Sequence, residues 1–174
     1  GSNTSVTVSA TVTPLALTVS GQSAVAKAYD GTSAATLTGG SLVGVVNSDN
    51  VTLNQIGTFA QSSVGATLAV SPGNTLSGIA SSNYSVIQPT NPMSAAITQR
   101  SLTVTGNAVS KTYDKNVYNL SAGSVSYNGF ASGESVANLG GSLSFSGIGS
   151  TAVNAGGPYA FTPAGLTSSN YNIS

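Results

Sequence analysis

The amino-acid sequence predicts a mostly β fold with little helix, arranged as two small β-rich domains in a head-to-tail array. Three observations predict it: apolar and polar residues alternate over short runs, glycine-rich breaks separate these runs, and a set of motifs occurs twice in the same order. Alternation with period two is typical of half-buried strands. Ordered recurrence indicates an internal repeat, and 174 residues are enough for two small domains.

Alternating apolar residues place strands along the whole chain. The first run is Val6, Val8, Ala10 and Val12, and further runs lie at 15–19, 102–104 and 143–145. Breaks that indicate turns lie at 39–40, 72–74, 140–141 and 156–158. Helical periodicity is confined to 133–139, where we expect one or two turns capped by Ser132 or Ser135.

Four motifs recur between the two halves of the chain. They are Leu-Thr-Val at 17–19 and 102–104, Lys-x-Tyr-Asp at 27–30 and 111–114, an acid-bearing Gly-to-Val stretch at 44–51 and 129–136, and Ser-Ser-Asn-Tyr at 81–84 and 168–171. Their offsets are 85, 84, 85 and 87 residues. We therefore expect a first repeat at 14–98 and a second repeat at 99–174, each with its own small core.

The ends of the repeats follow from the same comparison. Ser9–Thr13 matches Ser94–Thr98, so residues 1–13 are expected to be the terminal strand of a preceding repeat in a longer array. The second repeat is expected to be truncated before its own last strand. The parity of the apolar positions changes at Pro14 and again at 99–100, as it does where a near-continuous strand leaves one core and enters the next.

Composition argues against several classes of function. Charged residues make up 5% of the chain, the formal net charge is zero, and Cys and His are absent. The chain thus has no basic patch for nucleic acid, no disulfide, no usual zinc ligand, no histidine base and no apolar run long enough for membrane insertion. A glycosidase needs two facing carboxylates, and the two acids in each repeat match this requirement poorly. Calcium prefers several clustered carboxylates, whereas the polar segment 47–50 contains one. We predict no catalytic or metal-binding residue, no cofactor and no enzyme activity.

Twelve recurrent residues are structural candidates. Asp30 precedes Gly31 and is expected to bond nearby backbone amides in a turn, with the Lys27 stem lying along the Tyr29 ring. The recurrent tyrosines are expected to be core anchors, and the asparagines to begin strands after tight turns. The set is Lys27, Tyr29, Asp30, Asp49, Asn83 and Tyr84 in the first repeat, and Lys111, Tyr113, Asp114, Glu134, Asn170 and Tyr171 in the second.

A sharper alternative uses the Lys, the acid and the Asn of each repeat together. These three types form intramolecular isopeptide bonds in which a neutral, buried lysine attacks an asparagine amide. Such a cross-link would resist pulling, and it would lower the intact mass by about 17 Da per bond because ammonia leaves.

The quoted motifs resemble a known family of repeats. Lys27–Thr32 with Leu76-Ser77-Gly78 and Asn83-Tyr84 is similar to the YDG-type repeat, and Lys111–Asp114 with Pro163–Tyr171 is similar to the MBG domain. The second motif departs from the pattern because Lys115 follows Tyr-Asp in place of Gly. Such repeats occur in filamentous-haemagglutinin-like adhesins exported by two-partner secretion. The resemblance implies a small, mostly β and β-grasp-like unit on the cell surface of a Gram-negative bacterium, with an outer-membrane secretion partner.

These observations favour a structural stalk of a large secreted adhesin, in which the partners are neighbouring repeats of the same chain. In the alternative, the repeats are themselves an adhesive module that binds host glycan, matrix protein or a sister chain. Glycan-array binding and exposed aromatic side chains on one face would favour the alternative.

Overall fold

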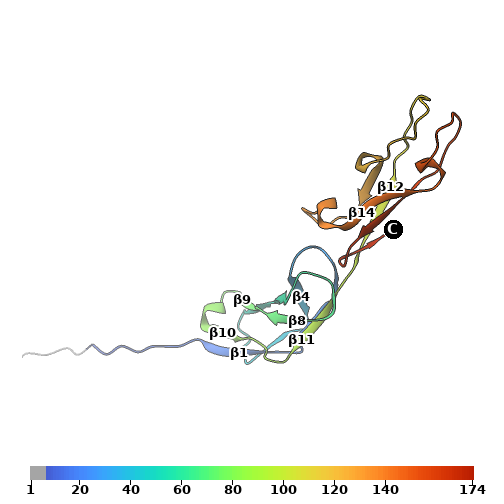
Figure 1. The fold of residues 1–174 in the computed structure, drawn as a ribbon. Helices are drawn as coiled ribbons and strands as arrows, with labels where there is room; N and C mark the ends of the chain where they lie inside the picture. The colour runs from blue at the N-terminus through green and yellow to red at the C-terminus, as the bar shows by residue number, and fades with distance from the viewer. Residues whose placement is uncertain (1–6) are drawn as a thin grey trace, which may run out of the picture. The chain divides into compact units, whose positions relative to one another are not determined.

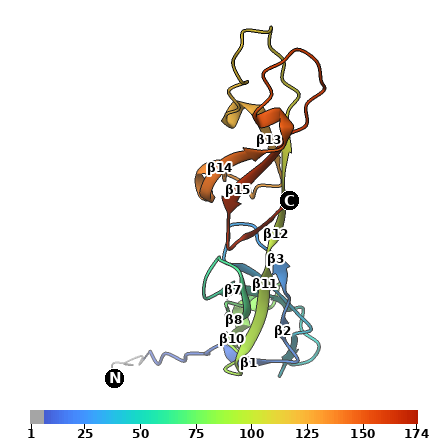
Figure 2. The ribbon, with the colours of Figure 1, turned by 45° about the vertical axis from the view of Figure 1, so that its right-hand side comes forward.

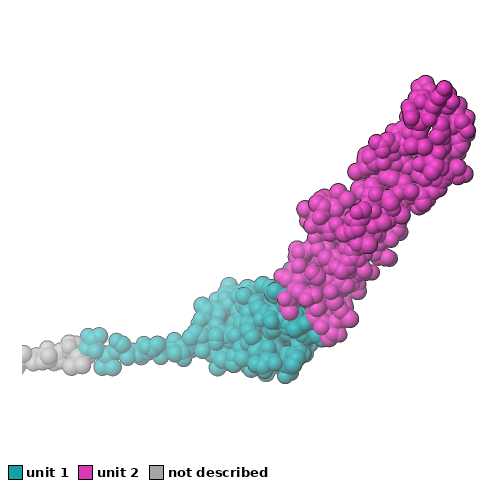
Figure 3. All heavy atoms as spheres, in the orientation of Figure 1, with its two compact units in different colours: residues 1–25, 34–59, 69–94 teal, residues 26–33, 60–68, 95–174 magenta. Residues whose placement is uncertain are grey.

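The structure, a computed structural model, describes residues 7–174 and confirms a mostly β fold. Within that range the helices are four 3₁₀ turns of three residues each, at Ser81–Asn83 (η1), Ala122–Ser124 (η2), Val136–Asn138 (η3) and Ile148–Ser150 (η4). The chain divides into two compact units (Figure 3). Unit 1 holds residues up to 25, 34–59 and 69–94, and unit 2 holds residues 26–33, 60–68 and 95–174.

Unit 1 is built from short, mostly antiparallel strands (Figure 1). β1 (Leu15–Ser20) lies between β10 (Tyr84–Ile87), which is parallel to it, and β5 (Ser41–Val43), which is antiparallel. β4 (Ala34–Thr38) pairs with β2 (Ser23–Ala24) and β7 (Ile56–Phe59), and β7 pairs with β8 (Gly65–Pro72). A separate antiparallel pair joins β6 (Thr52–Asn54) to β9 (Thr75–Ser77).

Strict alternation explains how these strands form a core. Along β4 the exposed and buried residues alternate, so that every second side chain faces inward. Leu17, in the run that the sequence predicts as a strand, is fully buried, at 0% exposure. The buried apolar residues of unit 1 are Leu17, Ala35, Leu37, Phe59, Val70 and Tyr84.

Unit 2 repeats the central arrangement of unit 1. β12 (Arg100–Gly106) lies between β16 (Tyr171–Ile173), which is parallel, and β13 (Val125–Asn128), which is antiparallel (Figure 2). β14 (Gly140–Ser146) and β15 (Thr162–Thr167) form an antiparallel pair. β3 (Lys27–Ala28) pairs in parallel with the end of β11 (Met93–Thr98). Only Gln99 separates β11 from β12, so the predicted near-continuous strand is present.

The two central sheets share their register as well as their order. Leu15 lies opposite Tyr84 in the first repeat, and Arg100 lies opposite Tyr171 in the second. The inward residues Leu17 and Leu102 are both 0% exposed. The buried apolar residues of unit 2 are Tyr29, Ile97, Leu102, Val125, Ala131 and Tyr171.

A glycine after the antiparallel strand is required at equivalent places in both repeats. Gly44 and Gly129 have φ of +103° and +118°, a backbone region that side chains disfavour. At Gly129 a Cβ would lie 2.4 Å from the carbonyl oxygen of Ser101. The chain can therefore turn tightly over the central strand only because this position carries no side chain.

The strand expected at residues 1–13 does not pair with another strand over its described part, residues 7–13. Residues 7–14 lie outside any strand and are exposed, with Val8 at 85% and Val12 at 95% exposure. Val6 and the rest of 1–6 lie outside the described residues. A strand needs a neighbour to satisfy its backbone groups, and no partner for this segment is present in the range that the structure describes.

Two local expectations have different outcomes. The turn expected at 140–141 is wrong, because both glycines belong to β14, where a register shift follows Gly141 at φ +76°. A glycine allows this irregularity within a strand. The helical stretch expected at 133–139 is one 3₁₀ turn, η3, and Ser135 caps it by accepting a hydrogen bond from the Ala137 N–H.

Candidate functional site

The two Lys-x-Tyr-Asp segments fold into the same charged turn. Lys27 Nζ lies 2.8 Å from Asp30 Oδ1, which also accepts the Thr32 backbone N–H at 2.9 Å. In the second repeat Lys111 Nζ lies 2.5 Å from Asp114 Oδ1, which accepts the Asn116 N–H at 2.9 Å. The lysines also donate to the carbonyl oxygens of Thr32 and Asn116. Each aspartate therefore holds a turn closed, and each lysine bridges that turn.

These contacts also set the acidity of the two aspartates. Burial alone would raise the pKa of Asp30, but the hydrogen bonds from Lys27 and Thr32 outweigh it and lower that pKa. At Asp114 the hydrogen bond from Lys111 is the largest cause of a lowered pKa, followed by the Asn116 amide. Both turns thus favour the ionised carboxylate.

A second recurrent feature, here called the acid–tyrosine corner, joins the acid-bearing loop to the tyrosine of Ser-Ser-Asn-Tyr. In the first repeat the Tyr84 hydroxyl donates to Asp49 Oδ2 at 2.7 Å and accepts the Val46 N–H at 3.1 Å. In the second repeat the Tyr171 hydroxyl donates to Glu134 Oε2 and accepts the Ala131 N–H at 2.8 Å. The two corners have the same connectivity, one repeat length apart.

The asparagine before each tyrosine ends the turn that leads into the strand. Asn83 closes η1 and Tyr84 begins β10. In the second repeat the Ser168 hydroxyl accepts the backbone N–H groups of Asn170 and Tyr171. The Asn170 amide oxygen also accepts the Val64 N–H at 3.1 Å, within unit 2.

Glu134 accepts a second tyrosine hydroxyl within unit 2. Tyr29 donates to Glu134 Oε1 at 2.5 Å, and its ring meets the Tyr171 ring edge to face at 5.5 Å between centroids. Tyr29 and Tyr171 are 6% and 3% exposed. We call Tyr29, Glu134 and Tyr171 the Glu134 cluster, in which one carboxylate joins residues of both predicted repeats.

The carboxylates make the three bonded tyrosines weaker acids. The hydrogen bond to Glu134, reinforced by burial, raises the pKa of Tyr29 to about 12. Burial and then the Glu134 hydrogen bond raise the pKa of Tyr171, and the Asp49 hydrogen bond raises that of Tyr84. In each case the raised pKa favours the protonated hydroxyl, which donates the hydrogen bond to the carboxylate.

Tyr113 departs from the expectation that all four recurrent tyrosines are core anchors. Its side chain is 53% exposed. Tyr29 is buried because Glu134 and Tyr171 contact it and because its N–H bonds to Thr98 in the strand alongside, at 2.8 Å. The segment around Tyr113 lies outside any strand.

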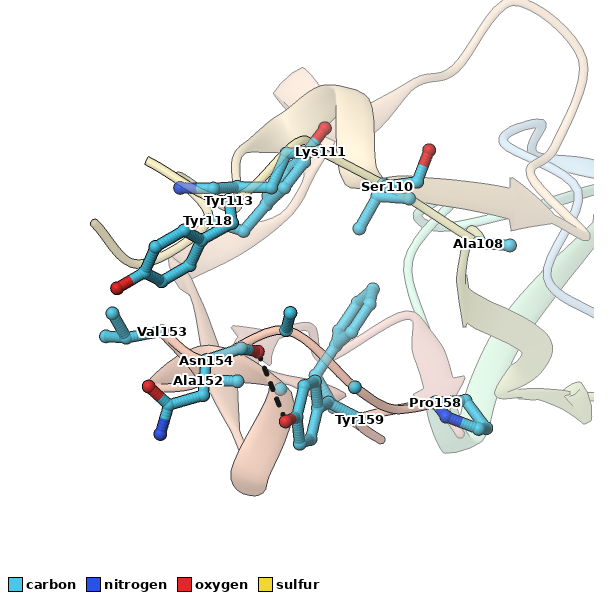
Figure 4. Close-up of a pocket in the computed structure, with 15 residues that line it drawn as sticks. Ala108, Ser110, Lys111, Tyr113, Tyr118, Ala152, Val153, Asn154, Pro158 and Tyr159 are labelled. Carbon is cyan, nitrogen blue, oxygen red and sulfur yellow. Dashed lines mark hydrogen bonds between the residues drawn. The ribbon is translucent and has the colours of Figure 1, made fainter. Parts of the chain in front are cut away.

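An open groove of about 410 Å³ lies beside Tyr113 in unit 2. Lys111, Tyr113 and Tyr118 lie along one wall, and Asn154 and Tyr159 lie along the other (Figure 4). The Tyr159 hydroxyl donates to the Asn154 carbonyl oxygen at 3.2 Å, which fixes the second wall locally.

The isopeptide chemistry finds little support in the arrangement of the lysines. The side chains of Lys27 and Lys111 are 20% and 26% exposed, and each pairs with an aspartate. A lysine nucleophile needs a neutral amine shielded from water. The partner amide is also engaged elsewhere in the second repeat, where Asn170 accepts the Val64 N–H.

Sequence reasoning missed a buried amide network in unit 1. Asn74 is 3% exposed and exchanges two side-chain hydrogen bonds with Gln22, each 2.9 Å long. Gln88 bonds the Asn74 backbone at both its N–H and its carbonyl oxygen. Asparagine and glutamine are usually surface residues, so the only available signal was the position of Asn74 in a Pro-Gly-Asn turn.

Comparison with known proteins divides the chain at nearly the same place as its internal repeat. Residues 13–93 match the family model of the YDG domain, and residues 102–174 match that of the MBG domain (YGX type), which confirms the resemblance. No curated protein and no solved structure matches the chain. Among the described residues, no helix has the length and apolar character needed to cross a membrane.

Proposed function

Because the chain consists of a YDG domain followed by an MBG domain, we propose that it is a pair of structural stalk repeats from a large bacterial surface adhesin. Domains of these types are non-catalytic repeat modules. In this role the repeats hold a distal adhesive region away from the cell, bind neighbouring repeats of the same chain, and need neither an active site nor a cofactor.

The observation that carries the proposal is the parallel pairing of the first and last strands of each repeat's central sheet. β1 pairs with β10 over four positions, and β12 pairs with β16 over three. Tension draws the start of the first strand and the end of the last strand in opposite directions. Because the strands are parallel, this motion loads their hydrogen bonds together in shear, rather than one after another.

The acid–tyrosine corners reinforce the same strands. Tyr84 and Tyr171 are the first residues of β10 and β16, and each is tied through its hydroxyl to an acidic loop. Sliding either strand therefore also breaks a hydrogen bond to a carboxylate, a kind of bond that is stronger than one between neutral groups.

Single-molecule force spectroscopy tests the mechanical role. The chain has no cysteine, so paired cysteines can be introduced as attachment points without competing thiols. Pulling between residues 100 and 173 shears β12 against β16, whereas pulling between residues 140 and 167 unzips β14 from β15. We expect a clearly higher rupture force in the shear geometry. Equal forces in the two geometries, or extension without resolved unfolding events, would contradict the proposal.

The location follows from the same role. We propose that the parent protein is secreted to the surface of a Gram-negative bacterium with the help of an outer-membrane secretion partner, and that these repeats neither insert into the membrane nor bind nucleic acid. The absence of cysteine supports this, because a chain without cysteine forms no early disulfide that would block its passage across a membrane in the unfolded state. Protease treatment of intact source cells should remove the repeats, and full protection would argue against a surface location.

A second candidate, a binding module for glycan or matrix protein, rests on the aromatic groove. Tyr113 and Tyr159 are 53% and 39% exposed in this groove, and exposed rings can stack on sugars. Glycan-array binding that Tyr113→Ala removes and Tyr84→Phe keeps would favour this reading over the stalk.

A further inference from the structure

The first Lys-x-Tyr-Asp segment shows the surroundings that this motif has when it is fully paired. In unit 2, β3 lies parallel to β11 with Lys27 opposite Ile97, and the Tyr29 N–H donates to the Thr98 carbonyl oxygen at 2.8 Å. The Tyr29 hydroxyl then reaches Glu134. Two contacts therefore complete the motif: a closing strand beside it and an acid from the next acid–tyrosine corner.

The second copy of the motif has neither contact within the described residues. Lys111–Asp114 lies outside any strand, and Tyr113 is largely exposed. The groove beside it is bounded on its other side by the loop that precedes β15. In the first repeat the corresponding loop, residues 60–64, precedes β8 and belongs to the segment 60–68, which packs in unit 2 together with 26–33.

The chain also contains groups of the kind that would complete the second motif, namely an exposed strand segment and a carboxylate with one oxygen still able to accept a hydrogen bond. Ser9–Thr13 matches the closing strand Ser94–Thr98, yet Val12 is 95% exposed where its counterpart Ile97 is 1% exposed. Asp49 is the counterpart of Glu134. In residues 7–174 its Oδ2 accepts the Tyr84 hydroxyl, but its Oδ1 accepts no hydrogen bond.

We infer that the segment 108–118 of the second repeat is a docking surface for a second copy of this chain. The second copy adds its residues 9–13 as a parallel strand beside Lys111 and Thr112, and its Asp49 accepts the Tyr113 hydroxyl. The register follows from the paired motif: Val12 of the second copy lies opposite Lys111, and its Thr13 carbonyl oxygen accepts the Tyr113 N–H. This inference rests on the proposed stalk function, because it describes how one pair of repeats would contact the next.

Physical arguments favour this occupant over a soluble ligand. A segment with unpaired backbone groups is completed by an added strand, and the exposed apolar side chain of Val12 gains a covered position. The contact joins different surfaces of the two copies, so it is a head-to-tail contact that leaves a free surface on each copy for a further one, as an open array requires. An array is the arrangement that a stalk requires.

A fused chain gives the sharpest test. If Ser174 is joined directly to Asn3 of a second copy, Ser9 of that copy follows Tyr171 by ten residues, the same spacing that separates Ser94 from Tyr84. Hydrogen exchange is then followed at the Tyr113 amide of the first copy. We expect exchange at least about tenfold slower than in the single chain, with protection similar to that of the Tyr29 amide.

Two variants of the second copy make the test specific. Val12→Lys places a charge at the covered position and should return the Tyr113 amide to the fast exchange of the single chain, while the fold stays intact because Val12 is exposed there. Asp49→Asn should keep the strand but lower the protection. Equal exchange in the fused and single chains, or protection that survives Val12→Lys, would overturn the inference.

Failure of this inference can be told apart from failure of the proposed function. The fused chain can be pulled from its two ends, and four domain-unfolding events are expected from its four repeats whether or not the copies dock. Fast exchange at Tyr113 together with four events would remove the docking surface and leave the stalk. Protection of Tyr113 only after addition of an oligosaccharide to the single chain would identify the groove as a ligand site and would overturn the docking surface.

Discussion

The two copies of the Lys-x-Tyr-Asp segment share their ion pair and their turn, but they differ in what covers their tyrosine. Lys27 and Lys111 make the same contacts to Asp30 and Asp114. Tyr29 is nevertheless 6% exposed and Tyr113 is 53% exposed. The local sequence therefore sets the turn, whereas burial of the ring depends on an adjoining strand and on a carboxylate more than a hundred residues away in the chain.

A comparable contrast separates the two acids. Asp49 accepts a hydrogen bond from one tyrosine hydroxyl, and Glu134 accepts hydrogen bonds from two. The acid–tyrosine corner is therefore a constant part of each repeat, and the second oxygen of its carboxylate is the variable part that can engage another motif. Substitutions in the core, at the acids and at the tyrosines are expected to have successively smaller effects on stability.

The largest effect is expected from the equivalent core leucines. Leu17→Ala and Leu102→Ala each empty a fully buried site, and such changes cost about 2–5 kcal/mol. Because the two side chains lie in different units, we expect each change to destabilise one unit selectively. Hydrogen exchange resolved by segment would show this, and equal loss of protection in both units after either change would show that they fold as one body.

Removing the acid should destabilise the second acid–tyrosine corner more than the first. Glu134→Ala leaves two tyrosine hydroxyls without their carboxylate and is expected to cost about 2–4 kcal/mol. Asp49→Ala removes one such bond and should cost clearly less. Urea unfolding of the two variants measures the difference, and an equal or reversed order would contradict the description of Glu134 as the doubly bonded acid.

Removing the tyrosine hydroxyls should affect stability differently in the two Lys-x-Tyr-Asp motifs. Tyr29→Phe removes a hydrogen bond to a carboxylate and is expected to cost about 1.5–3 kcal/mol. Tyr113→Phe alters an exposed side chain and should change the free energy of unfolding by less than about 0.5 kcal/mol. Thermal unfolding of both variants checks the contrast, since a comparable loss at Tyr113 would mean that its hydroxyl is already bonded.

Alkaline pH should reveal the same bond without mutation. The pKa of Tyr29 is raised from 10.0 to about 12 in the folded chain. The folded state therefore keeps a proton that the unfolded chain releases, so this contribution to stability is complete below pH 10 and is lost as pH rises from about 10 to about 12. Chemical unfolding at a series of pH values should show a shallower decline for Tyr29→Phe, and identical slopes would place the Tyr29 hydroxyl outside the cluster.

Much of the fold could be predicted because its signals are local or recurrent. Alternation locates β1, β12 and β14, and the recurrence of Ser-Ser-Asn-Tyr locates the paired starts of β10 and β16. The glycines at 140–141 were misassigned to a turn because a bulge in a strand requires the same backbone freedom as a turn.

The sequence predicted which residues belong to the candidate site, but not which of them are in contact. Recurrence identified Tyr29, Glu134 and Tyr171, but no spacing rule indicates that a carboxylate 105 residues from Tyr29 bonds to its hydroxyl. The exposure of Tyr113 was missed for the same reason, because burial depends on partners distant in sequence. The buried Asn74 network was missed because its residue types ordinarily face solvent.

The Glu134 carboxylate bonds Tyr29 to the second repeat, and a double-mutant cycle measures that link directly. Unfolding free energies of Tyr29→Phe, Glu134→Gln and the double variant give the coupling between the two side chains. Direct bonding predicts a coupling of about 1–2 kcal/mol, because residues in contact are not additive. A coupling of zero, with the two single effects simply summing, would contradict the direct bond that buries Tyr29 and that serves as the template for the docking surface.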